Sequence, residues 1–222
     1  MFDRAAELMN YGVAEKTVCL MDIPDEWGHG YDVDLYTETF DKAIKYAKQF
    51  PETLWCYGNH DLSYIWMQPE SGLSPFAIQA VTGKLAELRA SLPDDSQLAY
   101  IHRIDNVLFS HGGLTHAFAK FYTPGIEYKD TDAIISKINS LGFREIWDDV
   151  SPIWFRPQYN NEKMYREDDM LQVVGHTPVT EADRTGNVLS CDLFSLYRNG
   201  DPIGTQEFIL IDTETWEYQG LK

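Results

Sequence analysis

Apolar side chains recur at the spacing of an α-helix in several segments of the chain. In residues 35–50, Leu35, Phe40 and Ile44 share one face and lysines occupy the opposite face, so an amphipathic helix is expected. Pro51 marks its end, because proline does not continue a helix. Further helices are predicted in residues 2–11, 62–67, 76–91 and 131–141.

Short apolar runs between polar or turn residues predict β-strands. Asp105 and Asn106 separate two of these runs and indicate a hairpin. Residues 145–170 are irregular, aromatic and charged, and we expect a long loop there, which in a compact domain is usually functional or mobile. The expected strands are residues 18–21, 54–57, 98–104, 107–110, 171–174, 188–191 and 207–212.

Predicted helices and strands alternate in the first half of the chain, and strands dominate the second half. This order predicts an α/β fold and is compatible with two packed sheets flanked by helices. A chain of 222 residues lies within the single-domain range, and it contains no repeat, low-complexity tract or linker. We therefore expect one domain over residues 1–222.

The chain is strongly acidic, with a formal net charge of −17 and an isoelectric point near 4.6. Nucleic acid and anionic membranes repel such a surface, so neither is an expected partner. No apolar stretch is long enough to cross a membrane, and the first residues lack the apolar core of a signal peptide. Cys19, Cys56 and Cys191 are scattered and predict no disulfide framework. We expect a cytoplasmic protein, and the oligomeric state stays open.

Four polar side chains follow directly after expected strands. They are Asp22, Asn59, His111 and His176. Open α/β sheets place their reactive groups at the carboxyl ends of strands, so these side chains are candidates for one site. Two oxygen and two nitrogen ligands suit a borderline transition metal. His60, next to Asn59, is an imidazole outside this set that is able to deliver a proton.

The order of the motifs resembles the calcineurin-like metallophosphoesterase superfamily. The motifs are an Asp-x-x-Asp at residues 22–25, Gly-Asn-His-Asp at 58–61, His-Gly-Gly at 111–113 and Gly-His-Thr-Pro at 175–178. The likeness covers roughly residues 1–212 and is nearest to the branch of serine/threonine protein phosphatases and bacterial diadenosine-tetraphosphatases. It implies a four-layer α/β/β/α sandwich that hydrolyses a phosphoester with metal-bound hydroxide. Phosphoproteins, dinucleoside polyphosphates and small phosphomonoesters are all possible substrates.

The resemblance also implies roles for individual residues. The implied ligands of one metal ion are Asp22, Asn59, His111 and His176. Within this family pattern His60 is the general acid, Asp25 orients it, and Arg156 is a candidate phosphate clamp. The implied metal is Mn²⁺, with Fe or Zn²⁺ as alternatives; the family binds two ions, and this chain is expected to bind one or two. Without the resemblance, each residue has an ordinary structural role as an alternative. Asp22 and Asp25 would cap turns, and His111 and His176 would hydrogen-bond to nearby backbone groups. Arg156 would stack on its aromatic neighbours.

The sequence departs from the family pattern at its start. Family members open with a strand that ends in Asp-x-His, and no such motif precedes Asp22. Met21 and Glu26 replace a glycine and a phosphate-binding arginine of the second motif. Either the chain is a fragment whose fold lacks its first strand, which we favour, or it is a variant with an impaired first metal site. The second reading predicts a weak or inactive protein that binds a phosphorylated ligand or a protein partner. His29 is a less favoured replacement ligand, and Asp61 is expected to be structural.

Overall fold

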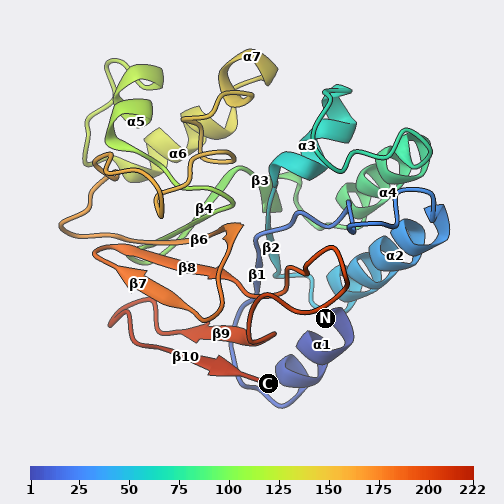
Figure 1. Cartoon of the computed structure of the whole chain (residues 1–222). Coiled ribbons are helices and arrows are strands. Elements are labelled where there is room, and N and C mark those ends of the chain that lie inside the picture. The colour runs from blue at the N-terminus through green and yellow to red at the C-terminus, as the bar shows by residue number, and fades with distance from the viewer.

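The strands of the computed structural model, which describes all residues from Met1 to Lys222, form three sheets (Figure 1). The first sheet is parallel and contains β1 (Val18–Cys19), β2 (Leu54–Cys56) and β3 (Leu98–Ala99) in that order. The second sheet is mixed and has the order β4-β5-β6-β8-β7. Its strands are β4 (Ile101–Ile104), β5 (Val107–Ser110), β6 (Leu171–Pro178), β7 (Asp183–Thr185) and β8 (Val188–Asp192). The third sheet is the antiparallel pair β9 (Phe208–Ile211) and β10 (Tyr218–Leu221).

Helices cover the two outer sides of the sheets (Figure 1). One group is α1 (Phe2–Asn10), α2 (Val33–Gln49), α3 (Asn59–Trp66) and α4 (Ile78–Ala90). The other group is α5 (His116–Tyr122), α6 (Thr131–Asn139) and α7 (Phe143–Ile146). Within these layers α2 contacts α1 and α4, and α6 contacts β4. The expected α/β fold, with helices outside two central sheets, is confirmed.

One hydrophobic core joins the layers. Ile44 of α2, Trp55 of β2, Leu108 of β5 and Ile134 of α6 belong to a single cluster of buried residues. Each such side chain contributes about 1.5–3 kcal/mol when it leaves water. The apolar face of α2 therefore packs as its spacing predicts, and the Asp32 carboxylate begins this helix by accepting the Leu35 N–H at 3.1 Å.

The prediction of a single strand over residues 98–104 is wrong. β3 ends at Ala99 and β4 begins at Ile101, and the two strands belong to different sheets. The side chain of Asn139 in α6 accepts the N–H groups of Tyr100 and Ile101 at 3.2 and 3.0 Å and donates to the Ile101 carbonyl at 2.8 Å. A distant asparagine thus satisfies the backbone where the chain changes sheets.

Other predicted boundaries differ less. The hairpin at Asp105 and Asn106 is confirmed, because Ile104 pairs with Val107. β6 continues to Pro178, through the polar motif that was expected to follow the strand. The short elements α7, β7 and β10 were not predicted. α5 begins at His116, and the Thr115 hydroxyl caps it by accepting the Phe118 N–H at 3.0 Å. None of the helices combines the length and apolar composition that a membrane crossing requires.

Candidate metal centre

Three of the four predicted ligands converge at the carboxyl ends of strands. β1 leads to Asp22, β5 leads to His111, and β6 carries His176 near its end. One ligand atom from each side chain lies within 4.8 Å of the others. These three residues therefore lie together in the fold, as the sequence predicted.

The hydrogen bonds of His111 fix the direction of its free lone pair. Its Nδ1 lies 2.7 Å from the Leu20 carbonyl oxygen, so Nδ1–H donates there. Its Nε2 then faces Asp22 Oδ2 at 2.9 Å and His176 Nδ1 at 3.2 Å. With a neutral His111, its Nε2 lone pair is directed at the Asp22 carboxylate oxygen, which is itself an acceptor. A cation or an added proton relieves that repulsion, and a backbone carbonyl on the second nitrogen is the usual partner of a metal-binding histidine.

Asn59 supplies a further oxygen at the same sheet edge. It begins α3, and the N–H of its neighbour His60 donates to Asp22 Oδ1 at 3.0 Å. Asn59 is 1% exposed, and its Oδ1 has no hydrogen-bond partner. A buried carboxamide oxygen without a partner is costly unless a ligand satisfies it. Together with the three converging acceptors, this orphaned oxygen fits a divalent metal ion.

The backbone around the site is strained. Asp22, Asp25 and His176 adopt left-handed conformations with φ of 57°, 78° and 60°. Such conformations cost about 1–3 kcal/mol each for residues other than glycine and concentrate at functional sites. Gly58 is required for a different reason, since a Cβ there would lie 1.9 Å from Asp22 Oδ1.

Asp61 holds the two strand ends together. Its carboxylate accepts the N–H groups of Asp22, Ile23 and Gly58 at 2.9, 3.2 and 2.9 Å. Burial and the charge of Asp22 raise the pKa of Asp61 to about 7. The side chain contacts backbone rather than the centre of the site, as expected of a structural carboxylate.

His60 and Asp25 form the expected pair. His60 Nδ1 lies 2.7 Å from Asp25 Oδ2, and the Asp25 side chain is 1% exposed. Burial lowers the pKa of His60, but the Asp25 hydrogen bond and the charge of Asp22 outweigh it and raise this pKa to about 9. His60 is therefore protonated near neutral pH, which is the state that a proton donor needs.

Tyr64 was missed by sequence reasoning. It is fully buried in α3, one turn after His60, and its hydroxyl donates to Asp25 Oδ1. The same hydroxyl accepts the Ser74 N–H at 2.8 Å. The spacing of four residues between His60 and Tyr64 places both on one helix face and is the signal that would have found it.

Arg156 lies beside His176. Its Nη1 donates to the His176 carbonyl at 2.8 Å and to the Thr177 hydroxyl at 3.1 Å. Burial, followed by the charges of His111 and Arg156, lowers the pKa of His176 to about 2, which keeps this imidazole neutral. Trp154 stacks edge-on against His176 with ring centroids 5.7 Å apart, so the aromatic neighbour of Arg156 contacts the histidine.

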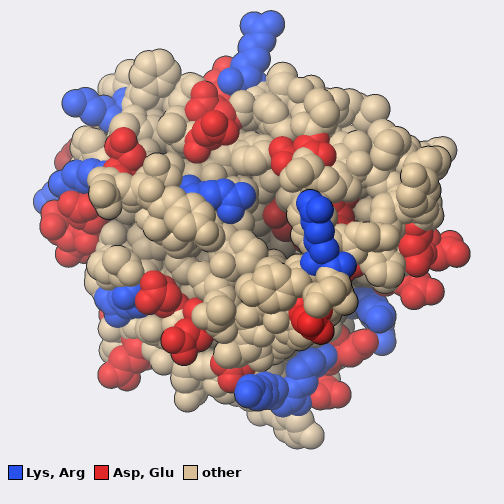
Figure 2. Space-filling model, in the orientation of Figure 1, with Lys and Arg blue, Asp and Glu red and all other residues tan.

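The surroundings of the site are mixed in charge. Acidic side chains are spread over the face that carries the central hollow, and both acidic and basic side chains border this hollow (Figure 2). Glu26 lines the same cavity as Asp22 and Arg156. His29 is exposed in the loop before α2, as expected of a loop histidine, and it is not part of the Asp22, His111 and His176 cluster.

Comparisons with known proteins agree with the motifs and the fold. The family model of calcineurin-like phosphoesterases matches residues 2–203. A solved cold-active protein tyrosine phosphatase of the psychrophile Shewanella sp. superposes with a TM-score of 0.55 at 14% identity, covering 93% of this chain and 69% of that chain. A point mutant of a cold-active protein tyrosine phosphatase gives 0.56 at 14% identity with the same coverage. No curated protein matches the chain significantly.

At this identity the two solved structures show a shared fold and nothing finer. The family model is the stronger finding, because it spans most of the chain and includes all the candidate site residues. Members of this family are in general metal-dependent phosphoester hydrolases. The chain belongs to the calcineurin-like phosphoesterase family.

Proposed function

We propose that this protein hydrolyses a phosphoester with a divalent metal ion held by four side chains. The proposed ligands are Asp22, Asn59, His111 and His176. The observation that carries the proposal is the convergence of ligand atoms: one atom each of Asp22, His111 and His176 lies within 4.8 Å of the others, and the Oδ1 of Asn59 is buried without a partner. When bound, the metal would lower the pKa of a water molecule and offset charge on the phosphoryl oxygens.

The mixed oxygen and nitrogen ligands favour a borderline transition metal. Mn²⁺ is the first candidate, and Fe or Zn²⁺ fit the same donors. The lowered pKa of His176 keeps its imidazole neutral, and a histidine binds any metal ion through an unprotonated nitrogen.

The second part of the proposal is that His60 protonates the leaving oxygen. Asp25 holds the Nδ1–H of His60, so the Nε2–H is left for the substrate. The raised pKa of His60 keeps that proton in place near neutral pH. The role of Asp25 is to orient the ring and to stabilise its charged form.

Arg156 is the proposed phosphate clamp. One guanidinium nitrogen is bonded to the backbone and hydroxyl oxygens next to His176, and this fixes the side chain at the edge of the site. Its Nη2 and Nε make no hydrogen bond and are free to bind two phosphate oxygens.

The proposed substrate class is a phosphoester in general. Phosphoproteins, dinucleoside polyphosphates and small phosphomonoesters all carry the required group. The structural neighbours are named as protein tyrosine phosphatases, which makes aryl phosphates suitable first probes.

Glu26 favours a second candidate function. Its carboxylate lines the cavity of the site and repels an anionic substrate. On this reading the protein is catalytically weak and binds a phosphorylated ligand or a protein partner.

Turnover of para-nitrophenyl phosphate with added Mn²⁺ separates the two candidates. The hydrolase proposal predicts metal-dependent turnover that falls about 10²-fold or more in His60→Ala. His29→Ala is the matched control, because this histidine is exposed and should leave the rate unchanged. Equal rates in the wild type and His60→Ala contradict the assigned proton donor. Calorimetric Mn²⁺ binding without turnover supports the second candidate.

A further inference from the structure

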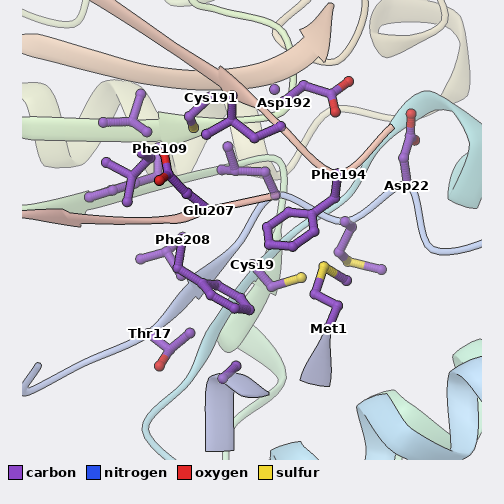
Figure 3. A pocket seen from close by; sticks show the side chains of 18 of the residues that line it. Met1, Thr17, Cys19, Asp22, Phe109, Cys191, Asp192, Phe194, Glu207 and Phe208 are labelled. Carbon is purple, nitrogen blue, oxygen red and sulfur yellow. The ribbon is translucent and has the colours of Figure 1, made fainter. Parts of the chain in front are cut away.

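Residues 195–203 form a short hairpin after β8, which we call the 195–203 hairpin. β8 ends at Asp192, and Asp192 pairs with Pro178, two residues after His176 in β6. Asp192 lies on the same side of the cavity as Asp22 (Figure 3). The base of the hairpin is therefore next to the candidate metal centre.

The hairpin is closed by hydrogen bonds within its own backbone. The Ile203 N–H donates to the Ser195 carbonyl at 3.0 Å. Nearer the tip, the Tyr197 N–H donates to the Asp201 carbonyl at 2.8 Å. Because these bonds tie the two arms together, Arg198 at the tip has a defined position relative to the base.

The tip of the hairpin reaches the opposite side of the site. The guanidinium carbon of Arg198 lies 5.0 Å from the centre of the Trp27 ring, which is a cation–π contact. Trp27 follows Asp25, the partner of His60, by two residues, and it lines the same cavity of about 1900 Å³ as His60. In Figure 1 the loop between β8 and β9 lies beside the segment that leads from β1 to α2. The hairpin thus spans the site from the metal ligands to the proposed proton donor.

The charge of Arg198 is not neutralised within the chain. Other arginines pair with carboxylates, namely Arg4, Arg89, Arg103 and Arg166. Arg198 is exposed and forms no salt bridge and no side-chain hydrogen bond, although the chain contains 35 acidic residues.

Trp27 orients this guanidinium without supplying a counter-charge. An aromatic face fixes the plane of an arginine side chain and leaves its N–H groups available. Such a group binds two oxygens of a carboxylate or phosphate at once. Glu26, the neighbour of Trp27, lines the cavity but forms no ion pair with Arg198. The tip of the hairpin therefore offers an open anion-binding group on the His60 side of the site.

We propose that Arg198 and Trp27 form a subsite for a second anionic group of the substrate. The inference rests on the proposed phosphoester hydrolysis and narrows its substrate class. Because the subsite lies on the side of the proton donor His60, the second anion belongs to the leaving group. The substrate is then a phosphoester whose leaving group carries a carboxylate or a further phosphoryl group. Arg198 contacts that anion, and Trp27 is a positioning residue that holds the guanidinium.

Binding of ligands that cannot be hydrolysed tests the subsite. The probes are alkylphosphonates of increasing chain length that end in a carboxylate, a second phosphonate or a neutral carboxamide. Calorimetry with Mn²⁺ present gives each Kd. The wild type should bind an anionic probe about fivefold or more tightly than the carboxamide of the same length, and Arg198→Gln should lose this preference. The stronger of the two anionic series identifies the group that the subsite takes.

Two further variants make the test specific. Arg184→Gln is the matched control, because Arg184 makes the same kind of contact with Trp216 at 5.5 Å and lies outside the cavity. This variant should keep the wild-type preference. Trp27→Leu should lose most of the preference although it retains the Arg198 charge. Chelation of Mn²⁺ by a probe in solution is the same for every variant and cancels in the comparison.

The proposal is overturned if the wild type shows no preference at any chain length, absence of binding included. It is also overturned if Arg198→Gln keeps the preference. A preference that survives unchanged in Trp27→Leu overturns the positioning role of Trp27.

These outcomes are separate from those of the hydrolase proposal, which fails if para-nitrophenyl phosphate is not turned over. Preference without turnover supports the subsite and favours the second candidate function. Turnover without preference removes the subsite and leaves the hydrolase proposal in place.

Discussion

At the scale of single residues, the site is arranged by side chains that do not themselves meet substrate. Asp25 receives His60 on one oxygen and the Tyr64 hydroxyl on the other. A carboxylate fixed at both oxygens leaves the imidazole little freedom to rotate. The roles of His60 and Asp25 were predictable from the sequence because both residues belong to recognisable motifs. The role of Tyr64 was not, because it depends on how the loop of residues 22–30 folds against α3.

Tyr64→Phe tests this hydrogen bond. The variant keeps the buried ring and loses only the donor to Asp25, so we expect kcat to fall about tenfold with little change in KM. The loss should be larger for phenyl phosphate than for para-nitrophenyl phosphate, because the poorer leaving group depends more on the proton donor. Steady-state kinetics on both esters measure it. Tyr159→Phe is the control, since Tyr159 is 73% exposed; an equal loss in both variants would contradict the account.

At the scale of elements, the sequence predicted what depends on local spacing. The amphipathic face of α2 and the hairpin between β4 and β5 follow from neighbouring residues alone. The break at Tyr100 was not predictable in this way, because it depends on Asn139, which is 39 residues away from Tyr100 in the chain. The early start of α3 was missed for a similar reason: Gly58 and Asp61 begin the helix while Asp61 also holds the loop at Asp22.

β4 carries a histidine that should make stability depend on pH. His102 is buried, and its Nε2 lies 3.0 Å from the Trp55 carbonyl oxygen. Burial lowers the pKa of His102 in the folded chain below its unfolded value. Its contribution to stability is therefore complete above the unfolded pKa of about 6.5 and is lost as the pH falls below it, since only the unfolded chain then binds the proton.

Urea unfolding of wild type and His102→Gln between pH 7.5 and pH 5 measures this effect. The glutamine retains a donor for Trp55 but does not titrate. We expect the wild type to lose up to about 1.4 kcal/mol more per pH unit than the variant below pH 6.5. Parallel pH profiles of the two proteins would show that His102 is not the source.

At the scale of the whole molecule, the net charge of −17 opposes the approach of an anionic substrate. The distribution of charge in Figure 2 shows acidic groups over the face around the hollow. The net charge and the motifs at the strand ends can be identified from the sequence alone. The sequence does not reveal the cavity that both β1 and β9 line, because these strands belong to different sheets and lie near opposite ends of the chain.

Added salt should therefore assist the binding of an anionic substrate. Raising NaCl from about 20 to 200 mM shortens the range of the repulsion, and we expect KM for para-nitrophenyl phosphate to fall about twofold or more with kcat nearly constant. Initial rates at fixed Mn²⁺ measure this, with sucrose at matched osmolality as the control. A KM that rises with salt would indicate that local positive charge, such as Arg156, dominates the approach.

The most direct test of the account is the position of the metal itself. Crystals grown with Mn²⁺, with anomalous diffraction recorded at the manganese edge, should show a peak about 2.0–2.4 Å from ligand atoms of four side chains. These are Asp22, Asn59, His111 and His176. A peak elsewhere, or no peak with the four side chains unchanged, would contradict the proposed metal centre.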